Sequence, residues 1–190
     1  MKHQQTDNKS LETLIQKIGA KDKEITKLNQ EMATLKQDLW SVCRNSAKTD
    51  FIFTINNFKN SFETSKKEDN ILKSKTFFCL DGYKARLNVY LNGYEDNNPY
   101  ISVFFHSLKG PLDEELQWPM PFRKVDISLF INGVMCSKES LTLEDNIQFP
   151  KPNNEGGGNF GFPKFYEHLK IPANIIDDKI QFKVAVFPIK

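Results

Sequence analysis

The 190-residue sequence has few cysteines, no excess of charge of one sign and no long apolar segment. Its three cysteines, Cys43, Cys79 and Cys136, include no CxxC pair, so they predict neither a disulfide framework nor a zinc site and favour a reducing compartment. A net charge of +2, with most Lys and Arg interleaved with acids, predicts no binding to nucleic acid or to an anionic membrane. No apolar run approaches the ~20 residues that cross a bilayer. We therefore predict a soluble, cytoplasmic protein.

Motifs for catalysis and for metal binding are also missing. The three histidines are far apart in the sequence, and none has a partner at the spacing of metal ligands. Gly156, Gly158 and Gly161 satisfy GxGxxG, but that motif needs a following helix, and FPKFYEHL follows instead. No GxSxG turn marks a nucleophile. We predict that the protein is not an enzyme and uses no metal and no cofactor.

What the sequence does contain is first a heptad pattern over residues 11–39, sustained for about four repeats without proline. With Leu11 at position a, eight of nine a and d positions are apolar, and Lys21 is the exception. This pattern predicts a coiled coil, with a single helix packed on a globular part as the alternative, and it leaves dimer or trimer open. The predicted interface positions are Leu11, Leu14, Ile18, Lys21, Ile25, Leu28, Met32, Leu35 and Leu39.

From Phe51 onward the sequence changes to short apolar alternations separated by turn residues. In GYKARLNVYLNG, residues 82–93, apolar residues from Ala85 to Leu91 alternate with polar ones, which predicts a half-buried strand that ends in an Asn-Gly turn. Many short strands without intervening helical patterns indicate an antiparallel β-sandwich. The predicted strands are 51–55, 75–80, 83–91, 100–108, 125–131 and 179–187. The predicted organisation is a disordered segment over 1–10, a coiled-coil stalk over 11–45 and a sandwich over 50–187.

Five motifs then follow one another in a recognisable order: GYKARLNVYLNG, YISVFFHSLKGP, LQWP, GNFGFPKF and IIDDKIQFKVAV. Together they resemble the carboxy-terminal domain of the tumour-necrosis-factor-receptor-associated factors (TRAFs), which has the meprin-and-TRAF-homology (MATH) fold. The resemblance implies an eight-stranded antiparallel β-sandwich preceded by an α-helical coiled coil. It also implies a homotrimer, with a dimer less favoured, and a groove for extended peptides from cytoplasmic tails of receptors or from adaptor proteins. Contact with a membrane would then be only indirect, through receptors.

The resemblance also implies which residues bind the peptide. Tyr90 matches the groove tyrosine of most members, whereas Asn88 stands where many members have an arginine, a charge that Arg86 would supply from a displaced position. Phe160-Gly161-Phe162 matches the edge of a subgroup that prefers proline, then glutamate, then an aromatic or acidic residue. Phe160 and Phe162 are expected to close the same groove as Tyr90. Phe104 and Phe149 are interpreted equally well as groove-lining or as core residues. The complete set is Arg86, Asn88, Tyr90, Tyr94, Phe104, Ile147, Gln148, Phe149, Phe160, Gly161 and Phe162.

Three functions fit these features. We favour a self-assembling signalling adaptor that binds linear peptides. The first alternative is a structural oligomerisation module whose groove has decayed, because Asn88 replaces the arginine and Asn146-Ile147-Gln148 replaces a serine triplet. The second alternative is a MATH module that recruits substrates to a ubiquitin ligase.

Overall fold

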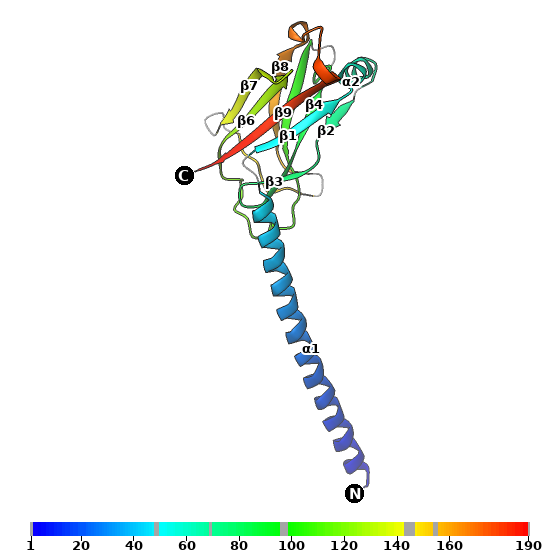
Figure 1. Cartoon of the computed structure of the whole chain (residues 1–190). Helices are drawn as coiled ribbons and strands as arrows, with labels where there is room; N and C mark the ends of the chain where they lie inside the picture. The colour runs from blue at the N-terminus through cyan, green and yellow to red at the C-terminus, as the bar shows by residue number, and fades with distance from the viewer. Residues whose placement is uncertain are drawn as a thin grey trace. The chain divides into compact units, whose positions relative to one another are not determined.

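The structure is a computed structural model that describes residues 2–47, 50–68, 70–95, 99–142, 147–153 and 156–189. Side chains of the first helix are described from Glu12 onward. The chain divides into two compact units, Met1–Val42 and Cys43–Lys190. The first unit is helical, and the second contains all the strands (Figure 1).

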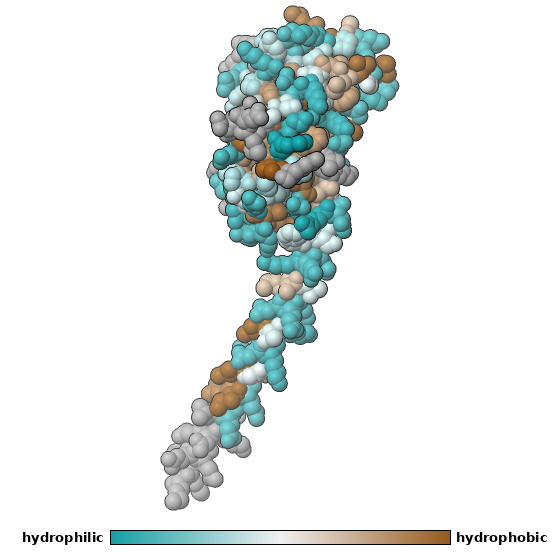
Figure 2. Space-filling view, turned by 90° about the vertical axis from the view of Figure 1, so that its left-hand side faces the viewer, coloured by the Kyte–Doolittle hydropathy of each residue, from teal (hydrophilic) through white to brown (hydrophobic). Residues whose placement is uncertain are grey.

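Helix α1 spans Lys2–Ser46. It therefore includes residues 2–10, for which the sequence predicted disorder; those residues contain no proline or glycine that would stop a helix. The predicted interface positions Leu14, Ile18 and Leu35 are 56%, 58% and 68% exposed, and Figure 2 shows apolar side chains along this helix. The side chain of Leu11 lies outside the described residues. Within the described part of the chain, no helix is long and apolar enough to cross a membrane.

The second unit is a sandwich of two antiparallel sheets, as the alternation of apolar residues predicted. The strands of sheet A, in spatial order, are β1 (Asp50–Asn56), β9 (Lys179–Pro188), β6 (Phe122–Ile131) and β7 (Val134–Thr142). The strands of sheet B are β2 (Ile71–Lys73), β4 (Tyr83–Tyr90), β5 (Tyr100–Ser107) and β8 (Asn159–Glu167), with β3 (Phe77–Cys79) also paired to β4.

The described residues form nine strands rather than the eight that were predicted, because two short strands pair with successive parts of β4. Strand β2 pairs with the end of β4, and β3 pairs with its beginning. Between them, the hydroxyl of Ser74 accepts a hydrogen bond from the backbone N–H of Leu87 at 2.9 Å. The Ser74 hydroxyl thus replaces a backbone carbonyl as the acceptor for Leu87. The edge that pairs with β4 is interrupted there, between β2 and β3.

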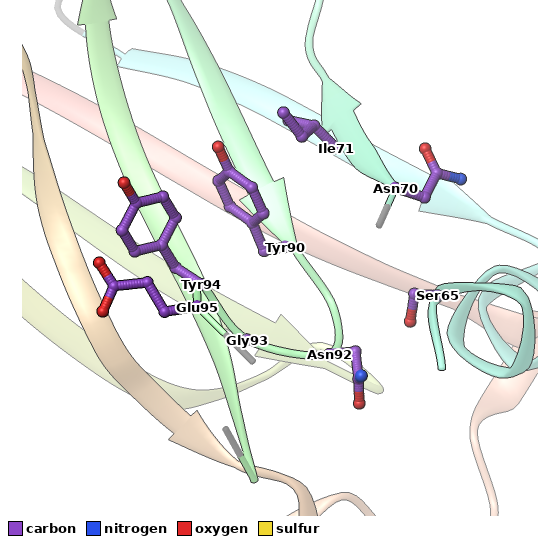
Figure 3. A pocket seen from close by; sticks show the side chains of 8 residues that line it. All are labelled: Ser65, Asn70, Ile71, Tyr90, Asn92, Gly93, Tyr94 and Glu95. Carbon is purple, nitrogen blue, oxygen red and sulfur yellow. The ribbon is translucent and has the colours of Figure 1, made fainter. Parts of the chain in front are cut away.

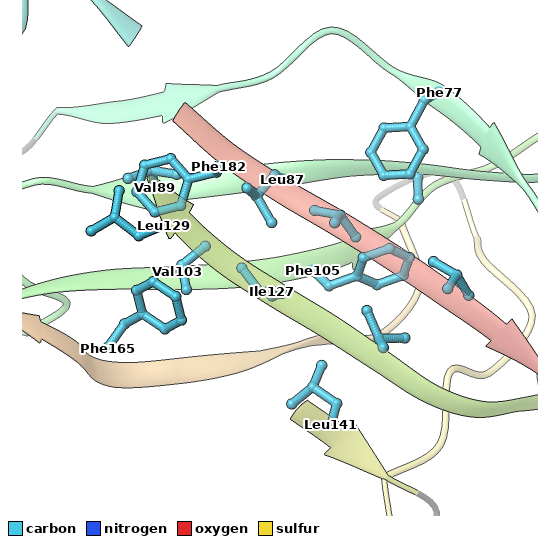
Figure 4. Close-up of a cluster of buried hydrophobic side chains, with 14 of the residues drawn as sticks. Phe77, Leu87, Val89, Val103, Phe105, Ile127, Leu129, Leu141, Phe165 and Phe182 are labelled. Carbon is cyan, nitrogen blue, oxygen red and sulfur yellow. The ribbon is translucent and has the colours of Figure 1, made fainter. Parts of the chain in front are cut away.

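The core lies between the two sheets and consists of the inward residues of every strand (Figure 4). Ala85, Leu87 and Val89 are at most 1% exposed, so the apolar face predicted for this strand is confirmed. Ile127 of β6 and Phe182 of β9 are fully buried in the same cluster. Because side chains alternate along a strand, the polar residues of β4 must lie on the outer face of sheet B.

Three short helices lie in the described part of the second unit. Helix α2 (Phe58–Ser65) buries Phe58, whose ring stacks on Phe62 at 5.6 Å, one helical turn further along. Two 3₁₀ helices, His168–Lys170 and Ile176–Asp178, follow β8 and precede β9. Sequence periodicity did not predict α2, because only two apolar residues mark its buried side.

The start of the second unit gives a first testable prediction. Cys43 is 2% exposed, and Arg44 forms an ion pair with Asp81 at 3.4 Å. We expect a chain that begins at Cys43 to fold, and a chain that begins at Lys48 to melt about 2–4 °C lower, since burial of one small apolar side chain is lost. Calorimetric melts of the two chains check this, and equal melting temperatures would contradict it.

Candidate functional site

The candidate site is the outer face of sheet B, where the pairing register places predicted residues from three strands in one row. Asn88 of β4 lies opposite Phe104 of β5, and Phe104 lies opposite Gly161 of β8. In the next row, Arg86 lies opposite His106. These residues come from distant parts of the sequence, and the sheet brings them together.

Three aromatic rings form a cluster on this face, which we call the aromatic cluster: Tyr90, Tyr94 and Phe104. The centroid of Tyr94 is 5.3 Å from that of Tyr90 and 4.9 Å from that of Phe104, and Tyr90 and Phe104 are 5.7 Å apart. Tyr94 is 38% exposed, whereas Phe104 is 8% exposed. Burial raises the pKa of the Tyr90 hydroxyl, Tyr94 raises it further, and Arg86 lowers it. The cluster therefore presents a rigid aromatic surface with hydroxyl groups to solvent.

The connection after β4 positions Tyr94. The predicted Asn-Gly turn is present: Gly93 has a φ of 86°, and its N–H donates to the carbonyl of Tyr90 at 3.4 Å. The next backbone N–H, that of Tyr94, donates to the hydroxyl of Ser102 at 2.8 Å. Ser102 is fully buried and donates in turn to the carbonyl of Pro163, so it ties the loop to both β5 and β8.

A cavity of about 250 Å³ lies beside Tyr90 and Tyr94. Ser65 of α2 and Ile71 of β2 line it together with Tyr90, Tyr94 and Glu95. In Figure 3 the rings of Tyr90 and Tyr94 project to the same side of the sheet. The two tyrosines thus line this cavity and also contact Phe104.

The polar half of the face lies around Asn88, which is 4% exposed. Its Nδ2 is 3.3 Å from Nδ1 of His106. Burial lowers the pKa of His106, and the charges of Arg86 and Lys73 lower it further. Lys73 of β2 is the residue opposite Asn88. Neutral His106 is therefore the favoured form near pH 7.

Gly161 lies where β8 passes very close to β5. A Cβ on Gly161 would clash with the carbonyl oxygen of Val103 and would lie 2.5 Å from Cα of Phe104. Only glycine fits at this distance without a shift of the backbone. Since Gly161 has no side chain, nothing from this residue covers the outer face beside Phe104.

Phe160 and Phe162 do not join the aromatic cluster, contrary to the expectation that they close the same groove as Tyr90. Both pack against the core, and they lie opposite Phe105 and Val103, whose side chains point inward. Their rings are 5.1 Å from Phe149 and 6.1 Å from Phe165, respectively. The reason is that side chains alternate between the two faces along β8. Because Gly161 pairs with the outward-facing Phe104, Phe160 and Phe162 must face the core.

The remaining predicted residues are divided between core and surface. Phe149 is fully buried, with its ring 5.2 Å from that of Phe122, so the core interpretation applies to it. Ile147 also packs against the core, whereas Gln148 is exposed. The prediction missed His106 and Ser102, although the alternation in YISVFFHS places both on the same face as Phe104.

Among the residues with described positions, no three His, Cys, Asp or Glu side chains gather as metal ligands. All three cysteines are free thiols, and burial raises the pKa of Cys79 to about 12, which keeps it protonated.

The part of the chain that forms the sandwich matches one family of domains. The model of the MATH domain matches residues 50–186, and the chain belongs to this family. It is similar to TNF receptor-associated factor 5 of Homo sapiens, with 30% identity over 139 residues that cover 70% of this chain and 22% of the relative. It is also similar to TNF receptor-associated factor 2 of Homo sapiens, with 26% identity over 191 residues that cover 95% of this chain and 37% of the relative.

A solved structure agrees on the fold. TRAF5 of Notothenia coriiceps matches with a TM-score of 0.65 at 23% identity, over 95% of this chain and 97% of that one. The predicted family resemblance is thereby confirmed. The chain spans only 22% and 37% of the lengths of the two human relatives.

Proposed function

We propose that this chain is a self-assembling cytoplasmic adaptor whose MATH domain binds extended peptides from receptor tails or from other adaptor proteins, without catalysis. The observation that carries the proposal is the aromatic cluster of Tyr90, Tyr94 and Phe104 on the outer face of sheet B. Aromatic rings that cluster on the surface of a domain are typical of binding sites. Folding of the domain alone would favour burial of these rings in the core. The similarity to two TNF receptor-associated factors supports a receptor as the partner.

The mode of binding follows from the position of β8. In the described part of sheet B, β8 is the last strand in the order, so no further strand of this sheet pairs with its outer edge. A peptide that pairs with this edge would place alternate side chains above the outer face. Gly161 leaves the approach to Phe104 open. Main-chain pairing would supply affinity, and the aromatic cluster would select the side chains.

Self-assembly is supported by the apolar positions of α1. Ile25, Leu28 and Met32 are 55–57% exposed in the single chain. Such an apolar surface at heptad spacing gains stability from burial against other copies. We propose a homotrimer, with a dimer as the alternative. Several weak peptide sites on one assembly would then bind clustered receptor tails with high avidity.

A reducing compartment is supported by the cysteines. Cys43 and Cys79 are buried and free, and Cys136 is also free. Free buried thiols are usual where disulfides do not form. This supports a cytoplasmic location for the adaptor.

A peptide array with proline-containing acidic peptides, followed by calorimetric titration of the best ones, tests the proposal. We expect micromolar to millimolar dissociation constants for single peptides and much tighter capture on densely coated surfaces. If the chain self-associates but no peptide binds, the protein is a structural oligomerisation module instead.

One prediction concerns the single charged residue at a predicted interface position. Lys21 lies at a d position, where ammonium groups from neighbouring chains would be desolvated together. We expect Lys21→Leu to strengthen self-association by about tenfold or more. Lys23→Leu is the matched control, because position f faces away from the interface. Sedimentation equilibrium measures both, and equal effects of the two substitutions would contradict the assigned heptad register.

A further inference from the structure

The cavity beside Tyr90 and Tyr94 has the chemistry of a site for a small cation. Among the described residues that line it, Glu95 is the one that carries a charge, and the others are aromatic, aliphatic or polar. The volume of about 250 Å³ is below the range of roughly 300–1,000 Å³ that is usual for sites of drug-sized ligands. The cavity therefore suits the charged end of one side chain better than a large molecule.

The two tyrosine rings attract a positive charge. Their centroids are 5.3 Å apart, and their planes meet at 77°. A cation is attracted to the face of an aromatic ring within about 6 Å of its centroid. Because the rings are close together and nearly perpendicular, one cation in the corner between them lies within this distance of both. An anion gains nothing from the ring faces, since they carry negative potential.

The backbone brings Glu95 to the same cavity as Tyr94. In an extended strand, consecutive side chains point to opposite faces. Glu95 instead has a φ of 65°, which is uncommon for a residue other than glycine. The chain turns there, and both side chains line the cavity (Figure 3). Glu95 takes part in no ion pair within the described parts of the chain, so its charge is available to a ligand.

Two cations of the chain lie close to these residues in sequence, but neither lines the cavity. Lys66 follows the lining residue Ser65, yet its Nζ is 2.7 Å from the carboxylate of Glu63 and 4.4 Å from the centroid of Phe62. Arg86 precedes Tyr90 by four residues on β4, whereas the cavity lies toward the turn that follows this strand. The negative charge at the cavity is therefore not neutralised by either of them.

The walls of the cavity are held in place by the protein itself. The N–H of Tyr94 donates to the buried hydroxyl of Ser102, and the hydroxyl of Ser65 donates at 2.7 Å to a carbonyl of its own helix. Ile71 lies opposite Tyr90 in the pairing of β2 with β4. A site that is formed in advance loses little conformational freedom when a ligand binds.

The position of the cavity determines which part of a bound peptide reaches it. Tyr90 lies opposite Ser102 of β5, and the neighbouring Ile101 lies opposite Tyr166 of β8, so the cavity is level with the end of β8. A peptide paired with the outer edge of β8 lies three strand spacings from β4, or roughly 14 Å. No single side chain spans this distance, and only residues beyond the paired segment reach the cavity.

We propose that this cavity binds the ammonium or guanidinium group of a lysine or arginine side chain of the bound partner. Tyr90 and Tyr94 contact the cation through their rings, and Glu95 pairs with its charge. The partner is the peptide of the proposed function, on which this proposal rests. The cavity adds to that peptide a basic residue outside the segment that pairs with β8.

The first experiment needs no peptide. Methyl nuclear magnetic resonance of the full chain follows Ile71, which lines the cavity, in separate titrations with N-acetyl-lysine amide, N-acetyl-arginine amide and the neutral N-acetyl-norleucine amide. We expect saturable shifts with the two cations, with dissociation constants in the millimolar range, and about tenfold weaker binding of the neutral compound. Shifts that do not saturate, or equal binding of all three compounds, would overturn the proposal.

Two substitutions identify the groups that bind the cation. We expect Glu95→Gln and Tyr94→Leu each to weaken binding of the lysine compound about threefold. Glu139→Gln is the matched control for charge, because it removes a carboxylate from an exposed position of β7 in sheet A. If Glu139→Gln weakens binding as much as Glu95→Gln, the cation responds only to the net charge of the chain, and the site is refuted.

The second experiment separates this proposal from the proposed function. The peptide that binds best on the array is extended at either end by glycine-serine linkers of several lengths that finish in lysine or in norleucine. We expect lysine to strengthen binding about threefold to tenfold at one end only, with the gain absent in Glu95→Gln. If lysine gives no gain at either end, the cavity does not bind the partner, and the proposed peptide binding still stands.

Discussion

Leu28→Asp is expected to abolish self-association of the chain. Leu28 lies at a d position near the middle of the heptad pattern, and its side chain is 57% exposed in the single chain. In a trimer this substitution would place three carboxylates within one apolar layer, where each is desolvated and repels the others. We expect assembly to weaken by a factor of about a thousand or more, since burial of a charge without a partner costs several kcal/mol. Sedimentation equilibrium of both proteins measures this.

Gln30→Asp is the matched control, because it adds the same charge at position f of the same heptad. It should leave the association constant almost unchanged. A wild-type chain that is monomeric at high micromolar concentration would refute the coiled coil and favour a helix without a partner. If both substitutions weaken assembly equally, the helix associates through a different face.

The sequence predicted the sandwich because its signal is local. In β4, the period of two alone separates the inward Leu87 and Val89 from the outward Asn88 and Tyr90. The burial of Leu87 and Val89 agrees, although Asn88 on the outer face is also buried. A long apolar alternation therefore identifies both the strand and its faces. The same signal is absent from β2, which has only three residues, and from much of β7, in which Leu141 is the only buried residue.

The site could be predicted only in part, because it depends on register between strands. Strand β8 was not among the predicted strands, and the motif Phe160-Gly161-Phe162 did not give the direction of its side chains. That direction is fixed by the pairing of Gly161 with Phe104, a contact between residues 57 positions apart in the sequence that no local pattern encodes. The inward packing of Phe160 and Phe162 leaves the outer face to Tyr90, Tyr94 and Phe104.

Tyr94 and His106 differ in how well the sequence alone could place them. Tyr94 follows the Asn-Gly turn, and its contact with Phe104 depends on a loop held by buried Ser102. Periodicity carries no information on such a loop. His106, in contrast, alternates with the buried Phe105 and was predictable as an outward residue. That His106 lies within hydrogen-bond distance of Asn88 on the neighbouring strand could not be predicted from the sequence.

Tyr90→Ala is expected to weaken peptide binding about thirtyfold, or about 2 kcal/mol, the loss typical of an aromatic residue at the centre of an interface. Tyr90 contacts both other rings of the aromatic cluster and also lines the cavity beside it. It is therefore shared by the aromatic cluster and the cavity. Calorimetric titration with the best peptide from the array measures the change.

Two further variants make the result specific. Tyr90→Phe keeps the ring but removes the hydroxyl, so it should retain most of the affinity if ring contacts dominate. Lys84→Ala, on the outer face of the same strand, should change nothing. Thermal melts of all three are needed, because loss of the ring contacts to Tyr94 and Phe104 is expected to cost Tyr90→Ala about 1 kcal/mol of stability. If the variant melts much lower than the wild type yet binds the peptide equally well, the peptide does not bind at the aromatic cluster.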